Sequence, residues 1–221
     1  MESIKTKELY DLNHTIVAEL LSECEYPFEA LPKISGFILK LIEGLDKDLF
    51  ECKGENIWVA KSAKVAPTAS ITGPCIIDEG AEVRHCAFIR GNALVGKNSV
   101  VGNSTELKNV ILFDNVQVPH YNYVGDSVLG YKSHMGAGSI TSNVKSDKTL
   151  VVVKNGDEKI ETGLKKFGAM LGDCVEVGCG SVLNSGTVIG KNSQVYPLSS
   201  VRGVVSANSI YKKAGEVVAK Y

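Results

Sequence analysis

The chain has 221 residues, of which 44% are hydrophobic, so one domain with a substantial core is expected, with at most a small appendage. Its formal net charge is -1, which gives no basic field for nucleic acid, and no run of about 18 apolar residues suits a membrane span, so we predict neither partner. The six cysteines have irregular spacings without a C-x-x-C pair, which predicts reduced thiols in a cytoplasmic protein.

Residues 1–52 carry the periodicity of helices. Apolar residues within 34–45 recur at steps of three and four behind Pro32, and those within 16–21 do likewise. We predict a helical cap, because the open end of a β-solenoid exposes unpaired strand edges that such a cap would cover. A helix that docks a partner is the alternative.

Residues 53–205 show a period of six. Nine aliphatic residues from Val59 to Leu107 follow at six-residue steps, and a small residue stands four places after each of the first eight. The pattern then shifts by one residue twice, continues to Met135, and resumes from Leu171 to Val201. This period fits neither a helix nor a flat sheet and indicates a three-sided all-β solenoid with inward aliphatic residues. We predict about seven coils, followed by a tail over residues 206–221.

Residues 142–166 interrupt the six-residue pattern. They are polar and contain Asn155-Gly156 directly after a run of valine and lysine, which is a strong hairpin signal. We predict a hairpin arm that leaves the prism. Long excursions from a rigid scaffold are often functional, and a disordered surface loop is the alternative.

Outward residues can be placed in columns, because one coil takes about 18 residues. Arg90 and Lys108 are one coil apart and each directly follows a core aliphatic residue, while Glu106 and Tyr123 fall in the flanking column. Stacked cations repel each other, so their alignment indicates a bound anion, for which phosphate is the best candidate. An exposed charge ladder balanced by Glu106 is the alternative.

His120 lies on the adjoining side of the prism, after Val118 and Pro119. Imidazole titrates near neutral pH, so a histidine beside a cationic patch is a candidate general base, and an ordinary surface histidine is the alternative. His85, Asn103 and His120 share a column, but the two histidines are two coils apart, about 9.6 Å, which is too far for one zinc ion. We predict no metal, and a zinc site between subunits is the alternative.

The stretch from Thr105 to Asn143, with VPHYNYVGDSVLG and MGAGSIT inside it, resembles a known family. It is similar to the acetyltransferase half of the bifunctional glucosamine-1-phosphate acetyltransferase and N-acetylglucosamine-1-phosphate uridyltransferase enzymes. It is more similar still to the C-terminal domains of archaeal-type sugar-1-phosphate nucleotidylyltransferases. The resemblance covers residues 57 to about 210 and is most specific over 83–143. It implies a left-handed parallel β-helix, a homotrimer, and acetyl transfer from acetyl-CoA to the amine of an amino-sugar 1-phosphate, in active sites between subunits.

Residue roles follow from this resemblance, position by position. His120 matches the general base. The residues matched to sugar-phosphate contacts are Arg90, Lys108, Tyr123 and, more loosely, Lys166. Glu106 is included among the candidate substrate-binding residues because it belongs to the same patch. His134 stands where the bifunctional enzymes have an asparagine that contacts the sugar, so either the ligand differs or the imidazole makes the same hydrogen bond. The positions matched to acetyl-CoA contacts are Ala137, Asn143, Cys179 and Pro197, and the basic residues considered for the coenzyme phosphates are Arg202, Lys212 and Lys213.

The nucleotidyltransferase domain of these enzymes, with its glycine-rich loop, has no counterpart in residues 1–52. The resemblance therefore implies acetyl transfer without uridylyl transfer, and a separate nucleotidyltransferase as a candidate partner. A non-catalytic hexapeptide-repeat module that serves such a partner as a sensor is the alternative function. A zinc hydro-lyase of the same fold is the third.

Overall fold

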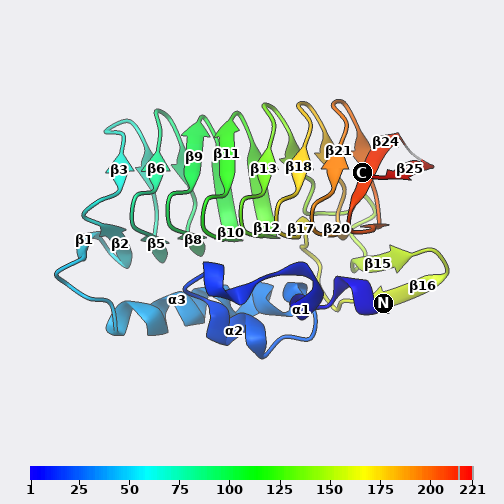
Figure 1. The fold of residues 1–221 in the computed structure, drawn as a ribbon. Coiled ribbons are helices and arrows are strands. Elements are labelled where there is room, and N and C mark those ends of the chain that lie inside the picture. The colour runs from blue at the N-terminus through cyan, green and yellow to red at the C-terminus, as the bar shows by residue number, and fades with distance from the viewer. Residues whose placement is uncertain (214, 221) are drawn as a thin grey trace.

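The six-residue period folds as a left-handed parallel β-helix in this computed structural model, which describes residues 1–213 and 215–220 (Figure 1). Each coil contributes one short strand to each of three faces, and the aliphatic residues of the period point into the prism. Val83, Val101, Val118 and Met135, for example, stack at the same place on successive rungs and are at most 1% exposed.

Face A is a stack of parallel strands that includes the second halves of two long ones. Its strands are β2 (Ile57–Ala60), β5 (Cys75–Ile77), β8 (Ala93–Val95), β10 (Glu106–Leu112), β12 (Tyr123–Leu129), β17 (Ala169–Leu171), β20 (Thr187–Ile189) and β23 (Val204–Val205). At the N-terminal end, β1 (Phe50–Gly54) pairs antiparallel with β2.

Faces B and C complete the prism. Face B has β3 (Lys64–Val65), β6 (Glu82–Val83), β9 (Val100–Asn103), β11 (Gln117–His120), β13 (His134–Met135), β18 (Glu176–Val177), β21 (Gln194–Val195) and β24 (Ser209–Lys213), with β25 (Glu216–Ala219) antiparallel to β24. Face C has β4 (Ser70–Ile71), β7 (Phe88–Ile89), the first halves of β10 and β12, β14 (Ile140–Thr141), β19 (Val182–Leu183) and β22 (Ser200–Val201).

The described residues form eight parallel strands on each of faces A and B, one rung more than the seven coils expected from the hexads. The additional rung contains Val205 and Tyr211, which are 2% and 6% exposed. The hexad count omits it because the turn at Gly203 shortens the step from Val201 to Val205. Part of the tail expected over residues 206–221 therefore continues the prism as β24.

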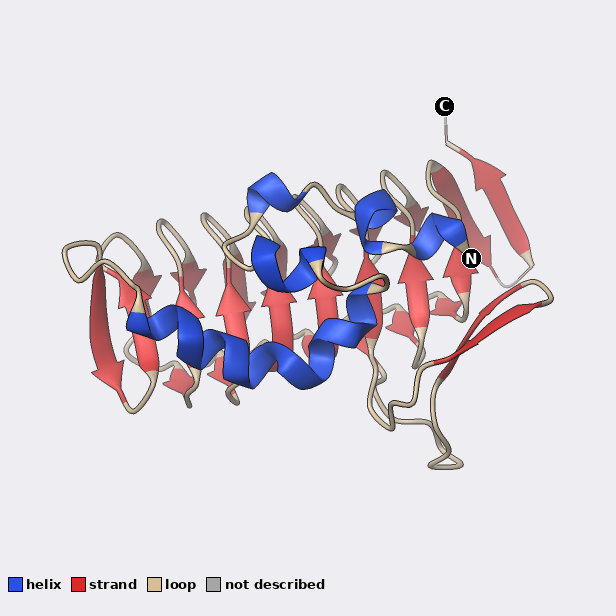
Figure 2. Ribbon diagram, turned by 90° about the horizontal axis from the view of Figure 1, so that it is seen from below, coloured by secondary structure: helices blue, strands red, loops and turns tan. Residues whose placement is uncertain are grey.

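The N-terminal segment is helical, as predicted, but it lies along face A instead of over the open end of the prism (Figure 2). Its elements are η1 (Glu2–Ile4), α1 (Thr6–Leu9), η2 (Leu12–His14), α2 (Ala18–Ser22), η3 (Pro27–Lys33) and α3 (Ile34–Glu43). The physical reason is that the outward residues of face A are apolar and need a cover. They are at most 1% exposed: Ile76, Leu94, Ile111, Val128, Met170 and Val188. None of these helices within the described residues has the length and apolarity that a membrane crossing requires.

Aromatic and backbone contacts fix the helical layer on face A. The ring of Tyr10 lies 4.9 Å from that of Phe113, centroid to centroid. The side-chain amide of Asn109 donates to the carbonyl of Leu31 at 3.2 Å, and the N–H of Asp173 donates to the carbonyl of Leu9 at 3.0 Å. The layer is therefore part of the core and not a detachable cap.

The hairpin arm is confirmed. Strands β15 (Val152–Asn155) and β16 (Glu158–Glu161) pair antiparallel around a turn in which Gly156 has a φ of 57°. Val151 and Val153 at the base of the arm are fully buried, so the arm packs back toward the prism. A Cβ added at Gly203 would lie 2.7 Å from the carbonyl oxygen of Lys154, which shows how closely β15 approaches the prism wall.

Glycines at the corners of the prism serve two different purposes. Gly80 and Gly91 have φ values of 66° and 87°, a left-handed conformation that favours glycine. Gly102 instead permits a close approach between rungs, because a Cβ at this position would lie 1.6 Å from the carbonyl oxygen of Pro119.

All six cysteines are free thiols, and they differ sharply in exposure. Cys52, Cys86 and Cys179 are exposed, whereas complete burial raises the pKa of Cys75 to about 12. We expect iodoacetamide at pH 8 to leave Cys75 unmodified in the folded protein, because the reactive thiolate is almost absent there. Peptide mapping by mass spectrometry measures this, and all six thiols should react in guanidinium chloride. Rapid alkylation of Cys75 in the native protein would contradict the packing of β5.

Candidate active site

His120 belongs to a column of residues along the corner between faces B and C. We call this column the corner file and define it as His85, Asn103, His120, Ala137, Cys179 and Pro197. Backbone bonds between successive rungs establish it: Tyr121 N to Asn103 O at 2.9 Å, Gly138 N to His120 O at 3.0 Å, Gly180 N to Ala137 O at 2.9 Å, and Leu198 N to Cys179 O at 2.9 Å. The predicted general base and three of the predicted coenzyme contacts therefore stand in one line.

The corner file offers an exposed imidazole followed by small side chains. His120 is exposed, and its imidazole forms no hydrogen bond with any other described residue. Cys179 and Pro197, further along the file, border a shallow hollow of about 240 Å³ on face B. His134 borders the same hollow, and its Nδ1 lies 2.8 Å from a carboxylate oxygen of Glu176 on the next rung.

The cationic patch lies on face C in the predicted columns. Glu106 is paired in register with Tyr123, and the N–H of Arg90 donates to the carbonyl of Leu107, which places Arg90 beside Lys108. Arg90 forms an ion pair with Glu106 at 2.7 Å. The alternative interpretation from the sequence, in which Glu106 balances the charge of the cations, therefore holds for Arg90. The guanidinium still has further N–H donors available for an anion.

Asp126 is the central residue of this patch, and sequence reasoning missed it. The residue is 4% exposed, and its carboxylate accepts hydrogen bonds from the Nζ of Lys108 at 3.2 Å, from the amide of Asn109 at 3.0 Å and from the amide of Asn143. The N–H of Gly168 also donates to its backbone carbonyl, at 2.8 Å. The sequence did contain a sign of this contact, because Asn109 and Asp126 are polar residues at the same corner of successive coils. Their φ values are 54° and 48°.

Asn143 and Lys166 lie at the cationic patch and not beside the corner file. Asn143 bonds to Asp126, and burial together with the charge of Asp126 raises the pKa of the neighbouring Tyr123. The arm leaves the prism after Asn143 and returns at Phe167, whose N–H donates to the carbonyl of Asn143 at 3.0 Å. Lys166, exposed and directly before Phe167, is therefore brought close to the patch by its backbone.

The predicted residues thus form two groups, one at the corner between faces B and C and one on face C. The corner file holds His120, Ala137, Cys179 and Pro197, while the patch holds the cations, Tyr123 and Asn143. Between them, the buried side chain of Asn122 fixes the turn: it accepts from the N–H of His120 at 3.1 Å and donates to the carbonyl of Gly136 at 2.8 Å. Within the described ranges, no side-chain bond joins the imidazole of His120 to the patch.

The described residues contain no preformed metal site. Across residues 1–213 and 215–220, no three His, Cys, Asp or Glu side chains gather closely enough to hold an ion. The exposed Cys86 thiol faces the Nε2 of His85 at 3.2 Å, and the Nδ1 of this ring faces the hydroxyl of Thr68 at 2.7 Å.

The six-residue period and the three-sided prism together define a hexapeptide-repeat β-helix. Residues 71–205 match the family model described as GMPPB C-terminal domain, and the chain belongs to this family.

Curated relatives confirm the resemblance seen in the sequence. The chain is 33% identical to a bifunctional protein GlmU of Methanococcus maripaludis over 72% of its length and 43% of that protein. It is 29% identical to a bifunctional sugar-1-phosphate nucleotidylyltransferase/acetyltransferase of Sulfurisphaera tokodaii, over 67% of this chain and 41% of that protein. The chain therefore spans less than half the length of these relatives. A solved hexapeptide transferase family protein from Anaplasma phagocytophilum is 15% identical, with a TM-score of 0.41 over 74% of this chain and 78% of that one.

Proposed function

We propose that the protein is an acetyl-CoA-dependent N-acetyltransferase that acts on an amino-sugar 1-phosphate. The observation that carries this proposal is the corner file, in which an exposed imidazole is followed on later rungs by Ala137, Cys179 and Pro197. An extended pantetheine chain needs room along the prism wall, and the small residues of the file, together with the hollow on face B beside them, leave such room.

In the proposed reaction, the sugar phosphate binds at Arg90 and Lys108. The amine nitrogen attacks the thioester carbonyl, and His120 accepts the proton that the amine loses. The carbon–sulfur bond then breaks, and coenzyme A leaves as a thiolate that takes up a proton. General base catalysis of this kind contributes about 10² to 10⁴-fold to the rate.

A homotrimer would unite the two groups of residues. Large apolar side chains are exposed beside the corner file: Tyr121 at 66%, Leu198 at 86% and Tyr196 at 44%. Exposed apolar side chains clustered beside a candidate site are typical of a protein interface. In our proposal, the corner file of one subunit faces the patch of its neighbour, so that each active site lies between two subunits.

The test is a thiol-release assay with the full chain, acetyl-CoA and a panel of hexosamine 1-phosphates. We expect coenzyme A to be released with an amino-sugar 1-phosphate and not with its N-acetylated form, because acetylation removes the nucleophile. Binding of both substrates without release of coenzyme A would contradict the proposal and favour a non-catalytic module that serves a separate nucleotidyltransferase.

A further inference from the structure

His85 and the adjacent Cys86 stand at the N-terminal end of the corner file and take no part in the proposed reaction. The backbone bonds between rungs place His85 two rungs, about 9.6 Å, before His120. The small residues of the file, which the proposed reaction gives to the coenzyme, lie on the opposite side of His120. The chemistry of the His85 and Cys86 side chains is therefore not explained by acetyl transfer.

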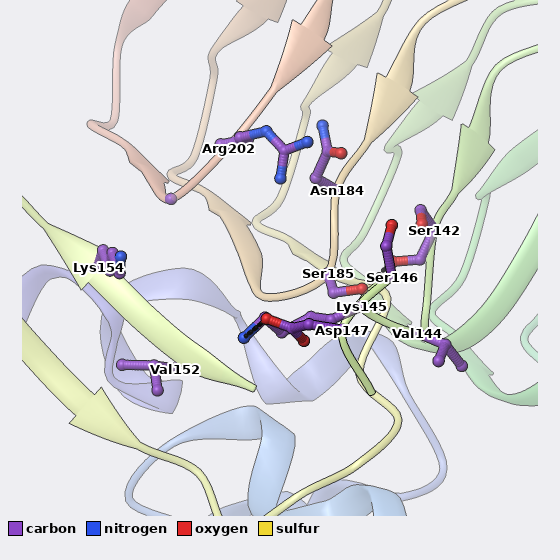
Figure 3. Close-up of a pocket in the computed structure, with 11 residues that line it drawn as sticks. Ser142, Val144, Lys145, Ser146, Asp147, Val152, Lys154, Asn184, Ser185 and Arg202 are labelled. Carbon is purple, nitrogen blue, oxygen red and sulfur yellow. Dashed lines mark hydrogen bonds and ion pairs between the residues drawn. The ribbon is translucent and has the colours of Figure 1, made fainter. Parts of the chain in front are cut away.

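A polar pocket between the arm and face C is also separate from these two residues (Figure 3). Figure 3 shows Asn184 and Arg202 on the prism wall that borders this pocket. Asn184 follows Cys179 on the same rung, and Cys179 lies four rungs, about 19 Å, beyond His85 in the corner file. A ligand in this pocket would not reach His85.

The thiol of Cys86 contacts the imidazole of His85, and both are held from the previous rung. The Sγ of Cys86 lies 3.2 Å from the Nε2 of His85. The Nδ1 of the same ring lies 2.7 Å from the hydroxyl oxygen of Thr68. The N–H of Cys86 donates to this oxygen as well, at 3.3 Å. Thr68 therefore fixes both the ring and the backbone that carries the thiol.

These three side chains have the arrangement that activates a nucleophile, in which a base contacts the nucleophile and a third group orients the base. When Nδ1 of His85 donates to Thr68, the lone pair of Nε2 faces the thiol and accepts its proton. The thiolate that results is the reactive form of cysteine. All three residues are exposed, so a small molecule in solution can reach the sulfur.

The other two exposed cysteines have no such base. The Sγ of Cys52 donates to the carbonyl oxygen of Gly54 at 3.2 Å, and this bond favours the protonated thiol. The sulfur of Cys179 forms no hydrogen bond with another of the described residues. Cys52 and Cys179 therefore serve as internal references for the reactivity of Cys86.

We propose that Cys86 is a site of reversible thiol–disulfide exchange with small disulfide compounds. The Cys86 thiolate attacks one sulfur of the disulfide, a new S–S bond forms, and the S–S bond of the small molecule breaks. The departing sulfur leaves as a thiolate and takes up the proton that the His85 imidazole holds. The Cys86 sulfur is thereby oxidised, and the departing sulfur is reduced to the same extent.

The test is the reaction of the full chain with 4,4′-dithiodipyridine at pH 7, followed by the absorbance of the released thiopyridone. We expect a fast phase that is lost in Cys86→Ser and retained in Cys52→Ser and Cys179→Ser. It should be about tenfold faster than the reaction of the other exposed thiols, because an ordinary cysteine is only a few per cent thiolate at this pH. With oxidised glutathione, peptide mapping by mass spectrometry should find the first adduct on Cys86.

Substitutions of the two supporting residues test the mechanism. We expect His85→Gln to slow the fast phase about tenfold, because glutamine is polar but does not take up the thiol proton. Thr68→Val should slow it by a smaller factor, whereas Thr68→Ser keeps the hydroxyl and the rate. Arg84→Gln is the matched control: it removes the neighbouring cation, which pairs with Glu82 at 3.0 Å, and should leave the rate unchanged.

Three results would overturn the proposal. The first is a fast phase that persists in Cys86→Ser, and the second is a Cys86 rate no higher than that of Cys52. The third is a Cys86 rate that His85→Gln leaves unchanged. The readout is thiol chemistry without acetyl-CoA, so a chain that lacks acetyltransferase activity gives the same result, and failure of the proposed function is distinguishable from failure of this site.

Discussion

Replacing His120 by alanine is expected to lower kcat for acetyl transfer by about 10² to 10⁴-fold, the contribution of a general base. The imidazole is exposed and forms no hydrogen bond with another described residue, so its removal should leave the thermal unfolding midpoint unchanged. Release of coenzyme A at saturating substrate measures the rate, and circular dichroism measures the unfolding transition.

His85→Ala is the matched control for this experiment. His85 belongs to the same corner file but lies two rungs away, about 9.6 Å, so we expect its replacement to change the rate less than twofold. Added imidazole should partly restore the rate of the His120→Ala protein, which a purely structural role would not explain. A His120→Ala protein that retains most of its rate would refute the assignment of the base.

The prism could be predicted in detail because side-chain size encodes it directly. Each coil needs an aliphatic residue inside and a small residue at the corner, so the sequence itself gives the register. The pairing of Glu106 with Tyr123, expected from one shortened coil, is the pairing found. The count of rungs was one too low only where the hexad is shortened, at Gly203.

The position of the helices was not predicted, although the sequence contained a signal for it. On face A the residue before the core aliphatic is itself apolar on rung after rung, as with Ile76, Leu94 and Ile111. Strands with apolar residues on both sides are typical of a sheet that is buried on both faces. The expectation of an end cap used the general need to protect strand edges and overlooked this stripe.

For the candidate site, the column argument predicts on which face of the prism each residue lies, but not which side chains contact one another. Columns placed Arg90, Lys108 and Tyr123 on one wall and put His120 on the next, as found. They could not reveal that Asp126 pairs with Lys108, because this contact depends on a left-handed turn that directs the carboxylate back to the previous rung. The columns also could not show that Asn143 lies away from the corner file, because its position depends on the path that the arm takes.

Replacing Asp126 by alanine is expected to destabilise the fold by about 3 to 5 kcal/mol, measured as the free energy of unfolding in urea. The Asp126 side chain is 5% exposed and that of Lys108 25%, so the substitution leaves a largely buried ammonium without its partner. It also removes the acceptor for the amides of Asn109 and Asn143, which join the prism to the helical layer and to the arm.

Glu106→Ala provides the matched comparison, because it breaks the neighbouring ion pair with Arg90. The side chains of this pair are 31% and 47% exposed, so water replaces the lost contact and the expected loss is below about 1 kcal/mol. Adding Lys108→Met to Asp126→Ala should recover part of the stability, since it removes the unpaired charge. Equal losses for Glu106→Ala and Asp126→Ala would mean that burial does not set the strength of these pairs, and the structural role assigned to Asp126 would be wrong.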